Sequence, residues 1–391
     1  MKFSLPNDVL MIIDRLDRAG FPADVVGGSV RDMLLGRSPD DFDITTSATP
    51  DEIKGVFADF RTVDTGIRHG TVGIIVEGRV YETTTYRVDG EYLDSRHPES
   101  VSFTRNIEED LARRDFTVNA IAYSPTHGIC DPFGGRADLE KGIIRAVGDP
   151  DLRFSEDALR ILRGLRFSAT FGFEIEEKTA VAIREKAYLL KKVSAERIWV
   201  ELRKTILAPH SYGVLKAYSE VFLSVMGGLK ELELPSEEAY ASADLLSRLL
   251  SLFVSEPGAF DLFCQALKTD SHIRRLGGSI LSSVGKYDLT NGLSLIRALR
   301  ALGEEAVRGL IKLEITLGNV KSDSLDLLDS LLTRGVCYRI SDLAVSGGDI
   351  MTLGISGRDV GLALEKLLTA VIEGRVKNER DALVNLLRKG I

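Results

Sequence analysis

The stretch Val25-Val-Gly-Gly-Ser-Val-Arg-Asp32 leads into Asp40-Asp-Phe-Asp-Ile-Thr45. The first string predicts a strand, a Gly-Gly turn and a helix. Glycines at such a turn let the backbone approach a ligand, and the free N–H groups at the start of a helix suit a phosphate. Gly28 and Arg31, whose guanidinium adds a charged donor, are therefore candidates for phosphate binding. A purely structural turn is the alternative for this string taken alone.

The second string alternates as a strand, which would place Asp41 and Asp43 on one face and Asp40 on the other. Two carboxylates so close repel each other unless a cation lies between them, and Mg²⁺ accepts carboxylate oxygens together with substrate phosphates. We therefore expect Asp41 and Asp43 to be catalytic metal ligands in a two-metal site, which can activate a hydroxyl and stabilise a leaving pyrophosphate. Solvated charge on an acidic turn is the alternative. Glu82, on a later strand, is a conceivable third ligand.

Beyond these strings, the chain of 391 residues is too long for one ordinary core. Up to about Gly148, β-branched runs alternate with Gly/Asp turns, and Glu77-Gly78 is a hairpin signal within the two strands expected over His69–Tyr86. From Ser155 onward, apolar residues recur at helical spacing through to Leu387. We expect an α/β head followed by an all-helical remainder.

Composition narrows the class of protein. The net charge of −8 argues against a broadly basic surface, so any nucleic-acid contact has to be local. No run of about 18 apolar residues is present, so no membrane span is expected. Cys130, Cys264 and Cys337 lie far apart and form neither a disulfide framework nor a zinc motif. Buried thiols in a reducing, cytoplasmic environment are expected.

The stretch Ser155–Phe167 is predicted to be one helix that begins at a serine N-cap. Asp157, Arg160, Arg163 and Arg166 then lie on one half of it, and the first two are neighbours because they are three residues apart. Cytosine and adenine present an amine beside an unprotonated ring nitrogen, whereas uracil and guanine present a carbonyl beside a ring N–H. An Asp acceptor next to an Arg donor therefore selects C and A. Arg163 is then available to bind phosphate, and Arg166 is less well aligned with Asp157 on the helix. The alternative to base reading is an intrahelical ion pair between Asp157 and Arg160.

Paired arginines stand at Arg113-Arg114, before an apolar stretch. Such pairs are usually surface charge. Because the residues that follow are expected to be buried, at least one of the two is a candidate to lean into a cleft.

Taken together, six strings resemble the class II tRNA nucleotidyltransferases, the bacterial CCA-adding enzymes and their poly(A) polymerase relatives. In chain order, and over about the first half of the sequence, they are GGSVRDMLLG, DFDITT, RRDFTVNAIAY, DPFGGRADL, EDALRILRGLRF and SAERIWVEL. The segment GISGRDVGLALEKLLTAVIEGRVKNERDALV resembles, less specifically, the tail of the shorter bacterial members.

The resemblance implies a DNA polymerase β-type nucleotidyltransferase head over residues 1–148, then an all-helical neck (149–205), body (206–343) and tRNA-binding tail (344–391). It also implies that Asp41 and Asp43 bind Mg²⁺. The residues that it assigns to the nucleotide pocket are Gly28, Arg31, Arg114, Asp157, Arg160, Arg163 and Arg166.

The implied activity is the template-independent addition of CCA to the 3′ end of tRNA from CTP and ATP, with release of pyrophosphate. Arg87–Pro98 corresponds to a flexible loop that is shortened in relatives adding only CC, so its presence favours an enzyme that reaches A addition. An A-adding enzyme, a poly(A) polymerase and a non-catalytic tRNA-binding protein are the alternatives. The basic residues near the end of the chain are equally compatible with an RNA-binding patch and with solvated surface charge. They are Arg375, Lys377, Arg380, Arg388 and Lys389.

Overall fold

The computed structural model describes residues 3–90 and 101–389. Contacts divide the chain into two compact units, Met1–Val225 and Met226–Ile391. The four-part division predicted from the sequence is finer than this and stays a prediction. Most of the predicted Arg87–Pro98 loop lies outside the described residues.

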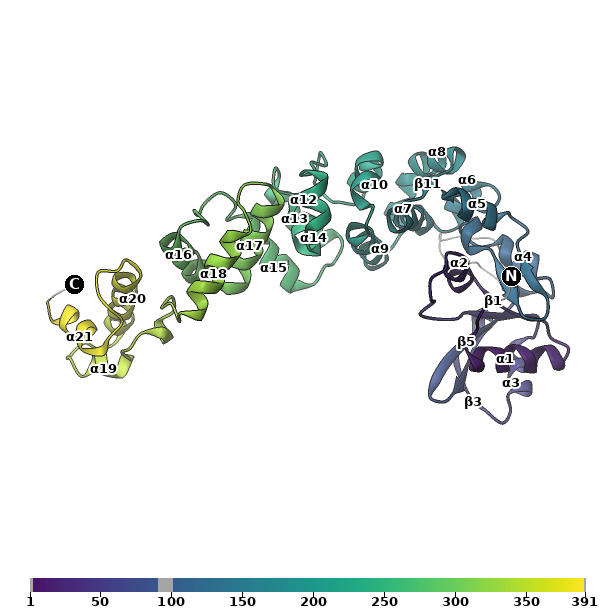
Figure 1. The fold of residues 1–391 in the computed structure, drawn as a ribbon, viewed down its shortest axis with the longest axis horizontal. Helices are drawn as coiled ribbons and strands as arrows, with labels where there is room; N and C mark the ends of the chain where they lie inside the picture. The colour runs from purple at the N-terminus through teal and green to yellow at the C-terminus, as the bar shows by residue number, and fades with distance from the viewer. Residues whose placement is uncertain (1–2, 91–100, 390–391) are drawn as a thin grey trace. The chain divides into compact units, whose positions relative to one another are not determined.

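A seven-stranded mixed sheet forms the centre of the first unit (Figure 1). Its only parallel neighbours are β2 and β5, and the remaining pairs are antiparallel. In spatial order the strands are β3 (Arg61–Gly66), β4 (Thr71–Val76), β5 (Arg79–Thr85), β2 (Ile44–Thr46), β1 (Ala23–Val26), β8 (Ala122–Ser124) and β9 (Gly128–Cys130). The predicted hairpin is confirmed: Glu77 and Gly78 join β4 to β5 with φ of 48° and 83°, the left-handed pair that a tight hairpin turn needs.

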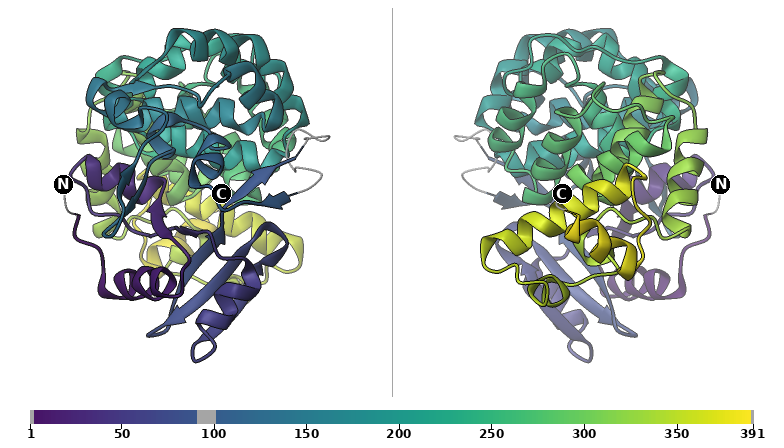
Figure 2. Two further views of the ribbon diagram at one scale, coloured as in Figure 1. Left: turned by 90° about the vertical axis from the view of Figure 1, so that its right-hand side faces the viewer. Right: turned by 90° about the vertical axis from the view of Figure 1, so that its left-hand side faces the viewer.

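Helices α1 (Asn7–Arg18) and α3 (Pro50–Val56) pack side by side on one face of this sheet (Figures 1 and 2). The apolar stripe of α1 is buried against the sheet, as its amphipathic spacing predicts. Helix α3 starts after Thr49, which forms a reciprocal capping box with Glu52. Helix α2 (Gly28–Leu34) follows β1 directly.

One predicted strand is shorter than expected. The alternation over Asp40–Thr45 predicted a strand, but β2 begins only at Ile44. Asp41 is exposed, and its carboxylate accepts the N–H of Phe42 at 2.9 Å, a local turn that competes with strand pairing. The carbonyl of Asp43 still accepts the N–H of Val26 at 3.1 Å, which fixes this residue beside β1.

From Pro150 the unit is almost entirely helical, as predicted. The one interruption is β11 (Glu174–Ile175), which pairs with β10 (Ile143–Ile144). The helices are α6 (Pro150–Glu156), α7 (Leu159–Phe171), α8 (Glu177–Lys186), η3 (Ala187–Lys192), α9 (Ala195–Leu207), α10 (Ser211–Ala217) and α11 (Ser219–Leu223). Between β5 and β8 lie β6 (Arg87–Asp89), β7 (Val101–Phe103), α4 (Ile107–Ala112) and η2 (Thr117–Asn119), and α5 (Gly135–Lys141) lies between β9 and β10.

The predicted single helix from Ser155 is wrong. Ser155 lies inside α6, and the chain breaks at Asp157, whose φ of −138° and ψ of 103° are extended. The Asp157 carboxylate accepts the N–H of Leu159 at 3.1 Å, so it satisfies a free donor at the start of α7. Helical periodicity alone does not reveal this break, because both helices keep the same apolar spacing.

The second unit is all helical in its described part. Helix α17 packs against α13, α15, α16 and α18, and the short helix α19 packs with α20 and α21 in a C-terminal cluster that α16 also contacts (Figure 1). The bounds are α12 (Glu237–Ser242), α13 (Leu245–Ser251), α14 (Pro257–Ala266), α15 (Ser271–Leu281), α16 (Gly292–Leu302), α17 (Glu304–Thr316), α18 (Asp323–Thr333), η4 (Ile340–Asp342), α19 (Gly347–Met351), α20 (Arg358–Ile372) and α21 (Arg380–Arg388).

All three cysteines are free thiols; Cys264 and Cys337 are buried, as expected, whereas Cys130 is only partly so. Within residues 3–90 and 101–389, no helix is both long and apolar enough to cross a membrane.

A buried carboxylate lies within the sheet on β1. Asp24 is 4 % exposed, and the hydroxyl of Tyr86 donates to it at 2.9 Å. Burial raises the pKa of Asp24 to about 6, although Tyr86 and His127 oppose the shift. Because the pKa is higher in the folded protein than in the unfolded chain, Asp24 favours folding below about pH 4 and loses that contribution as the pH rises through 6.

We predict that Asp24→Asn, which cannot ionise, gains about 3 kcal/mol of stability relative to the unmodified protein as the pH rises from 4 to 7. The chain has a single tryptophan, Trp199 in α9, so urea titrations followed by its fluorescence report on the first unit. Asp14→Asn, at an exposed carboxylate of α1, is the control and should show no such pH-dependent gain. A stability difference for Asp24→Asn that stays constant with pH would contradict the assignment.

Candidate active site

A pocket of about 200 Å³ lies beside Asp43, the residue that directly precedes β2. Asp43 contributes the acidic group, and Thr45, Thr71 and Thr84 contribute hydroxyl-bearing side chains from β2, β4 and β5. Val26, Ile44, Arg87, Arg113 and Arg114 complete the lining. Both arginines of the predicted Arg113-Arg114 pair therefore reach a cleft.

The electrostatics of the pocket suit a divalent cation. Burial raises the pKa of Asp43; the charge of Asp41 raises it further, and Arg114 opposes the shift. A cation held by both carboxylates removes this penalty. The residues of the described chain contain no cluster of three or more His, Cys, Asp or Glu side chains suited to a metal, so Glu82 is not gathered with the pair. Two carboxylates leave coordination positions open for phosphate oxygens and water, as Mg²⁺ requires.

Arg114 is fixed between a glycine and a buried carboxylate. Its Nη2 lies 3.5 Å from Asp110, which is fully buried and also accepts two hydrogen bonds from Arg113. Gly27, the N-cap of α2, has φ of 75° and ψ of −127°, and a Cβ there would lie 2.9 Å from Arg114 Nη1. Gly27 therefore needs to be glycine for both its backbone conformation and its contact with this guanidinium. Gly28 is the first residue of α2.

Three of the predicted nucleotide-binding arginines converge on one aromatic ring. The guanidinium carbons of Arg31, Arg163 and Arg166 lie 5.3, 5.4 and 4.1 Å from the centre of the Phe167 ring. Arg166, which helical spacing left less well aligned, is thus brought together with the other two. A group of cations on an aromatic face is suited to binding a polyphosphate.

Buried acceptors hold each of these arginines. Asp115 accepts from Arg163 at 2.7 Å and from the amide of Asn119 at 3.0 Å, and the amide oxygen of Asn119 accepts from Arg31 at 2.7 Å. Glu201 in α9 accepts from Arg166 at 2.6 Å. Burial alone would raise the pKa of Asp115, but Arg163 and Asn119 hold it at about 2. The protein itself therefore holds the three guanidinium groups in place.

The side chains of the predicted Asp157–Arg160 pair form no hydrogen bond or ion pair with each other in the described part of the chain; the two residues are joined only through the backbone, where the Arg160 N–H donates to the Asp157 carbonyl at 3.0 Å. The helix break turns Asp157 away from the face of α7, and its carboxylate binds Arg197 of α9 at 2.7 Å. Arg160 is 9 % exposed and donates to Glu156 at 2.6 Å and to the carbonyls of Arg153 and Arg113. The intrahelical pair weighed in the sequence analysis is therefore wrong.

Sequence reasoning missed several residues of the site. They are Gly27, Asp110, Asp115, Asn119, Phe167, Arg197 and Glu201. The i, i+4 spacing of Arg197 with Glu201 was an available signal, because both residues lie on one face of α9. Their partners lie far away in the chain and could not be read from it.

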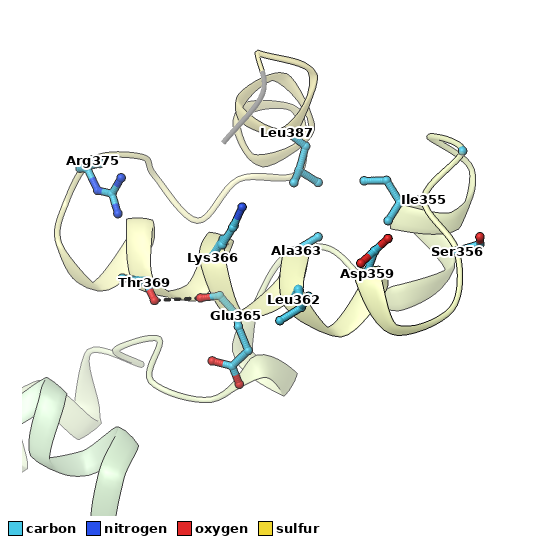
Figure 3. Close-up of a pocket in the computed structure, with 11 residues that line it drawn as sticks. Ile355, Ser356, Asp359, Leu362, Ala363, Glu365, Lys366, Thr369, Arg375 and Leu387 are labelled. Atoms are coloured by element: carbon cyan, nitrogen blue, oxygen red, sulfur yellow. Dashed lines mark hydrogen bonds between the residues drawn. The ribbon is translucent and has the colours of Figure 1, made fainter.

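The second unit contains a cavity of its own. It measures about 710 Å³ and lies between α20 and α21 (Figure 3). Ile355, Ala363 and Leu387 gather at one end, while Lys366 and Arg375 lie toward the other. No residue predicted for nucleotide or metal binding lines it.

The basic residues expected near the end of the chain divide into two groups. Arg375 binds Glu373 at 2.7 Å and Arg380 binds Asp349 at 2.6 Å, so both are engaged within the second unit. Lys377, Arg388 and Lys389 are exposed and make no ion pair with other described residues.

We predict that Gly27→Ala lowers the affinity for CTP by about tenfold or more, because the new methyl group displaces Arg114. Gly357→Ala is the matched control. Gly357 is also a helix N-cap, with φ of 63° and ψ of −133°, but nothing lies within 4 Å of its Cβ position. Both variants carry the same backbone strain, so equal CTP affinities by calorimetry would show that Arg114 plays no part.

Comparison with known proteins identifies the family. Residues 23–145 match the family described as the Poly A polymerase head domain, and residues 172–221 match the probable RNA and SrmB-binding site of polymerase A. The CCA-adding enzyme of Streptococcus mutans is 36 % identical over 98 % of this chain and 97 % of its own length. That of Lactobacillus helveticus is 38 % identical over 96 % of this chain and 95 % of its own.

Comparison with solved structures points to the same family. The Bacillus stearothermophilus CCA-adding enzyme in complex with CTP is 31 % identical, has a TM-score of 0.77 and covers 97 % of each chain. The Thermotoga maritima CCA-adding enzyme in complex with tRNA is 21 % identical, covers 98 % of this chain and 96 % of its own, and with a TM-score of 0.71 shows the same fold. With its mixed-sheet head, helical remainder and full-length similarity, this chain belongs to the CCA-adding enzyme family of tRNA nucleotidyltransferases.

Proposed function

We propose that this chain adds cytidine, cytidine and adenosine to the 3′ end of tRNA, using CTP and ATP without a nucleic-acid template. The observation that carries the proposal is the Asp41/Asp43 pair beside Arg114, in the same unit as the arginines around Phe167. Membership in the CCA-adding enzyme family supports it, as does the likeness to a CCA-adding enzyme solved with CTP.

In the proposed reaction the 3′-hydroxyl oxygen of the RNA forms a bond to the α-phosphorus of the nucleotide. The bond from that phosphorus to the pyrophosphate oxygen breaks, and the hydroxyl proton is lost to solvent. The family uses divalent metal ions, and we assign Mg²⁺ to Asp41 and Asp43. When bound, the metal lowers the pKa of the attacking hydroxyl and neutralises charge on the phosphates in a two-metal arrangement.

The arginine cluster binds the triphosphate in this proposal. Arg31, Arg163 and Arg166 supply guanidinium donors, Gly28 lets the backbone approach, and Arg114 interacts electrostatically with both Asp43 and Asp115. Because Asp115, Asn119 and Glu201 already orient these groups, little reorganisation is needed on binding.

Asp157 and Arg160 read the base in this proposal, each held by other protein groups. Three of the five N–H donors of Arg160 are used within the described chain, which leaves two for the ring nitrogen of C or A. The Asp157 carboxylate accepts from Leu159 and Arg197 and keeps lone pairs for the exocyclic amine. Arg197 also fixes the orientation of that carboxylate.

The remaining predictions fit the same proposal. We assign the chemistry to residues 1–148, base recognition to 149–205 and RNA contacts to the helical body (206–343) and tail (344–391). We place the activity in the cytoplasm, which fractionation of cells producing the protein would test.

The test uses tRNA transcripts ending just before CCA or after CC, each with CTP or ATP alone. We predict two cytidines on the first and one adenosine on the second. Asp41→Asn and Asp43→Asn should reduce each incorporation by on the order of 100- to 1,000-fold or more, since the charges that hold the metal are lost. Asp40→Asn, in the same exposed segment, is the control and should remain active.

Incorporation of adenosine only, on the second transcript, would show an A-adding enzyme, and long adenosine tails would show a poly(A) polymerase. Full activity of both variants at Asp41 and Asp43 would overturn the metal assignment.

A separate prediction concerns selectivity. Asp157→Ala should reduce discrimination of CTP against UTP by about 5- to 100-fold while lowering turnover less, because the amine acceptor is lost. Arg160→Ala should act in the same direction. Asp151→Ala, at an exposed carboxylate of α6, should leave the ratio unchanged. Unaltered discrimination in both site variants would exclude this pair as the base reader.

A further inference from the structure

An exposed aromatic residue lies next to the pocket at Asp43. In the ladder between β6 and β7, Phe103 stands directly opposite Arg87, and Val88 stands opposite Ser102. Phe103 is 44 % exposed and Val88 is 41 % exposed. Because side chains alternate along a strand, Arg87 and Phe103 lie on one face of this hairpin and Val88 lies on the other.

Arg87 and Phe103 both contact the segment His69-Gly70. Arg87 Nη1 donates to the His69 carbonyl at 2.6 Å, and a Cβ on Gly70 would lie 2.8 Å from the Phe103 ring. Only glycine leaves room for the ring at this place. The next residue along the chain, Thr71, lines the pocket, and so does Arg87. Phe103 does not itself line the cavity that contains Asp43, but it is the cross-strand neighbour of Arg87, which does; we call this position the Phe103 rim.

The pocket carries groups suited to a ribose and a phosphate. The hydroxyls of Thr71 and Thr84 lie 3.0 Å apart. Arg87, Arg113 and Arg114 line the same cavity, and Asp89 and Asp110 lie behind them as ion-pair partners. When a cation binds the carboxylate of Asp43, the positive charges around this pocket outnumber the negative charges. The pocket then favours the binding of a phosphate group.

This pocket is distinct from the arginine cluster, because Arg31, Arg163 and Arg166 do not line it. The proposed reaction needs two substrates, and the cluster serves one. We propose that the Phe103 rim and its pocket bind the 3′-terminal nucleotide of the RNA acceptor. Its base stacks on Phe103, its phosphate lies near Arg87 and Arg113, and its 3′-hydroxyl points to Asp43. The inference rests on the proposed function.

A subsite for the acceptor end has to bind different terminal bases, and stacking on an aromatic ring allows this. During addition of three nucleotides the end of the acceptor changes, first to one cytidine and then to the next. A subsite that read base edges would bind one of these ends and reject the others. An aromatic face accepts every base, since each base has a π-face.

The test measures KM for tRNA ending just before CCA and KM for CTP separately, in variants of the full chain. Phe103→Leu retains an apolar contact with Gly70 but removes the stacking face. We expect it to raise KM for the RNA by about 5- to 100-fold and to leave KM for CTP within about twofold. Phe103→Tyr and Phe103→Trp should restore the RNA KM. Val88→Ala, on the opposite face of the same hairpin, should behave as the unmodified protein.

A wild-type RNA KM in both Phe103→Leu and Phe103→Ala would overturn the proposal, as would equal increases in the RNA and CTP values. Thermal midpoints of all variants show whether folding is intact. Absence of CTP incorporation by the unmodified protein would instead refute the proposed function, so the two failures are distinguishable.

Discussion

The first unit depends on one electrostatic constraint, which is that several guanidinium groups lie close together around Phe167. Mutual repulsion would separate Arg31, Arg163 and Arg166 if nothing compensated them. Asp115 and Glu201 supply that compensation, and both are nearly buried, at 8 % and 5 % exposed. Because Asp115 precedes η2, Arg163 and Arg166 lie on α7 and Glu201 lies on α9, satisfying these charges also fixes the helices against the sheet domain.

The break at Asp157 follows from the same constraint. A continuous helix would direct this carboxylate along the face of α7, next to Arg160. With the break, Asp157 reaches Arg197 while Arg160 reaches Glu156 and two carbonyl groups, so each of the two charges has a partner of its own. An ion pair between the two side chains would instead occupy the acceptor and the donor that the proposed base reading needs. Helix α9 carries both Arg197 and Glu201, and so contacts both Asp157 and Arg166, which the proposed function assigns to the base and to the phosphates.

The sequence predicted those structural features that depend on the spacing of residues close together in the chain. The hairpin at Glu77-Gly78, the capping box before α3 and the change from mixed sheet to helices all follow from patterns a few residues long. The strand expected over Asp40–Thr45 and the helix expected from Ser155 were wrong because aspartate side chains satisfy backbone N–H groups locally and end regular structure. Contacts such as that of Asp115 with Arg163 join distant residues, and periodicity does not report them.

The two nucleotide environments differ in a way that bears on selectivity. In the proposed function the incoming nucleotide meets Asp157 and Arg160, polar groups whose donors and acceptors are already oriented by the protein. In the further proposal the base of the acceptor end meets Phe103, a ring without hydrogen-bonding groups, while the nearby hydroxyl and guanidinium groups are assigned to the ribose and phosphate. Selection is therefore applied to the nucleotide being added and withheld from the end that receives it. A protein that extends successive, different ends without a template requires this division, because strict recognition of the acceptor base would stop addition after one step.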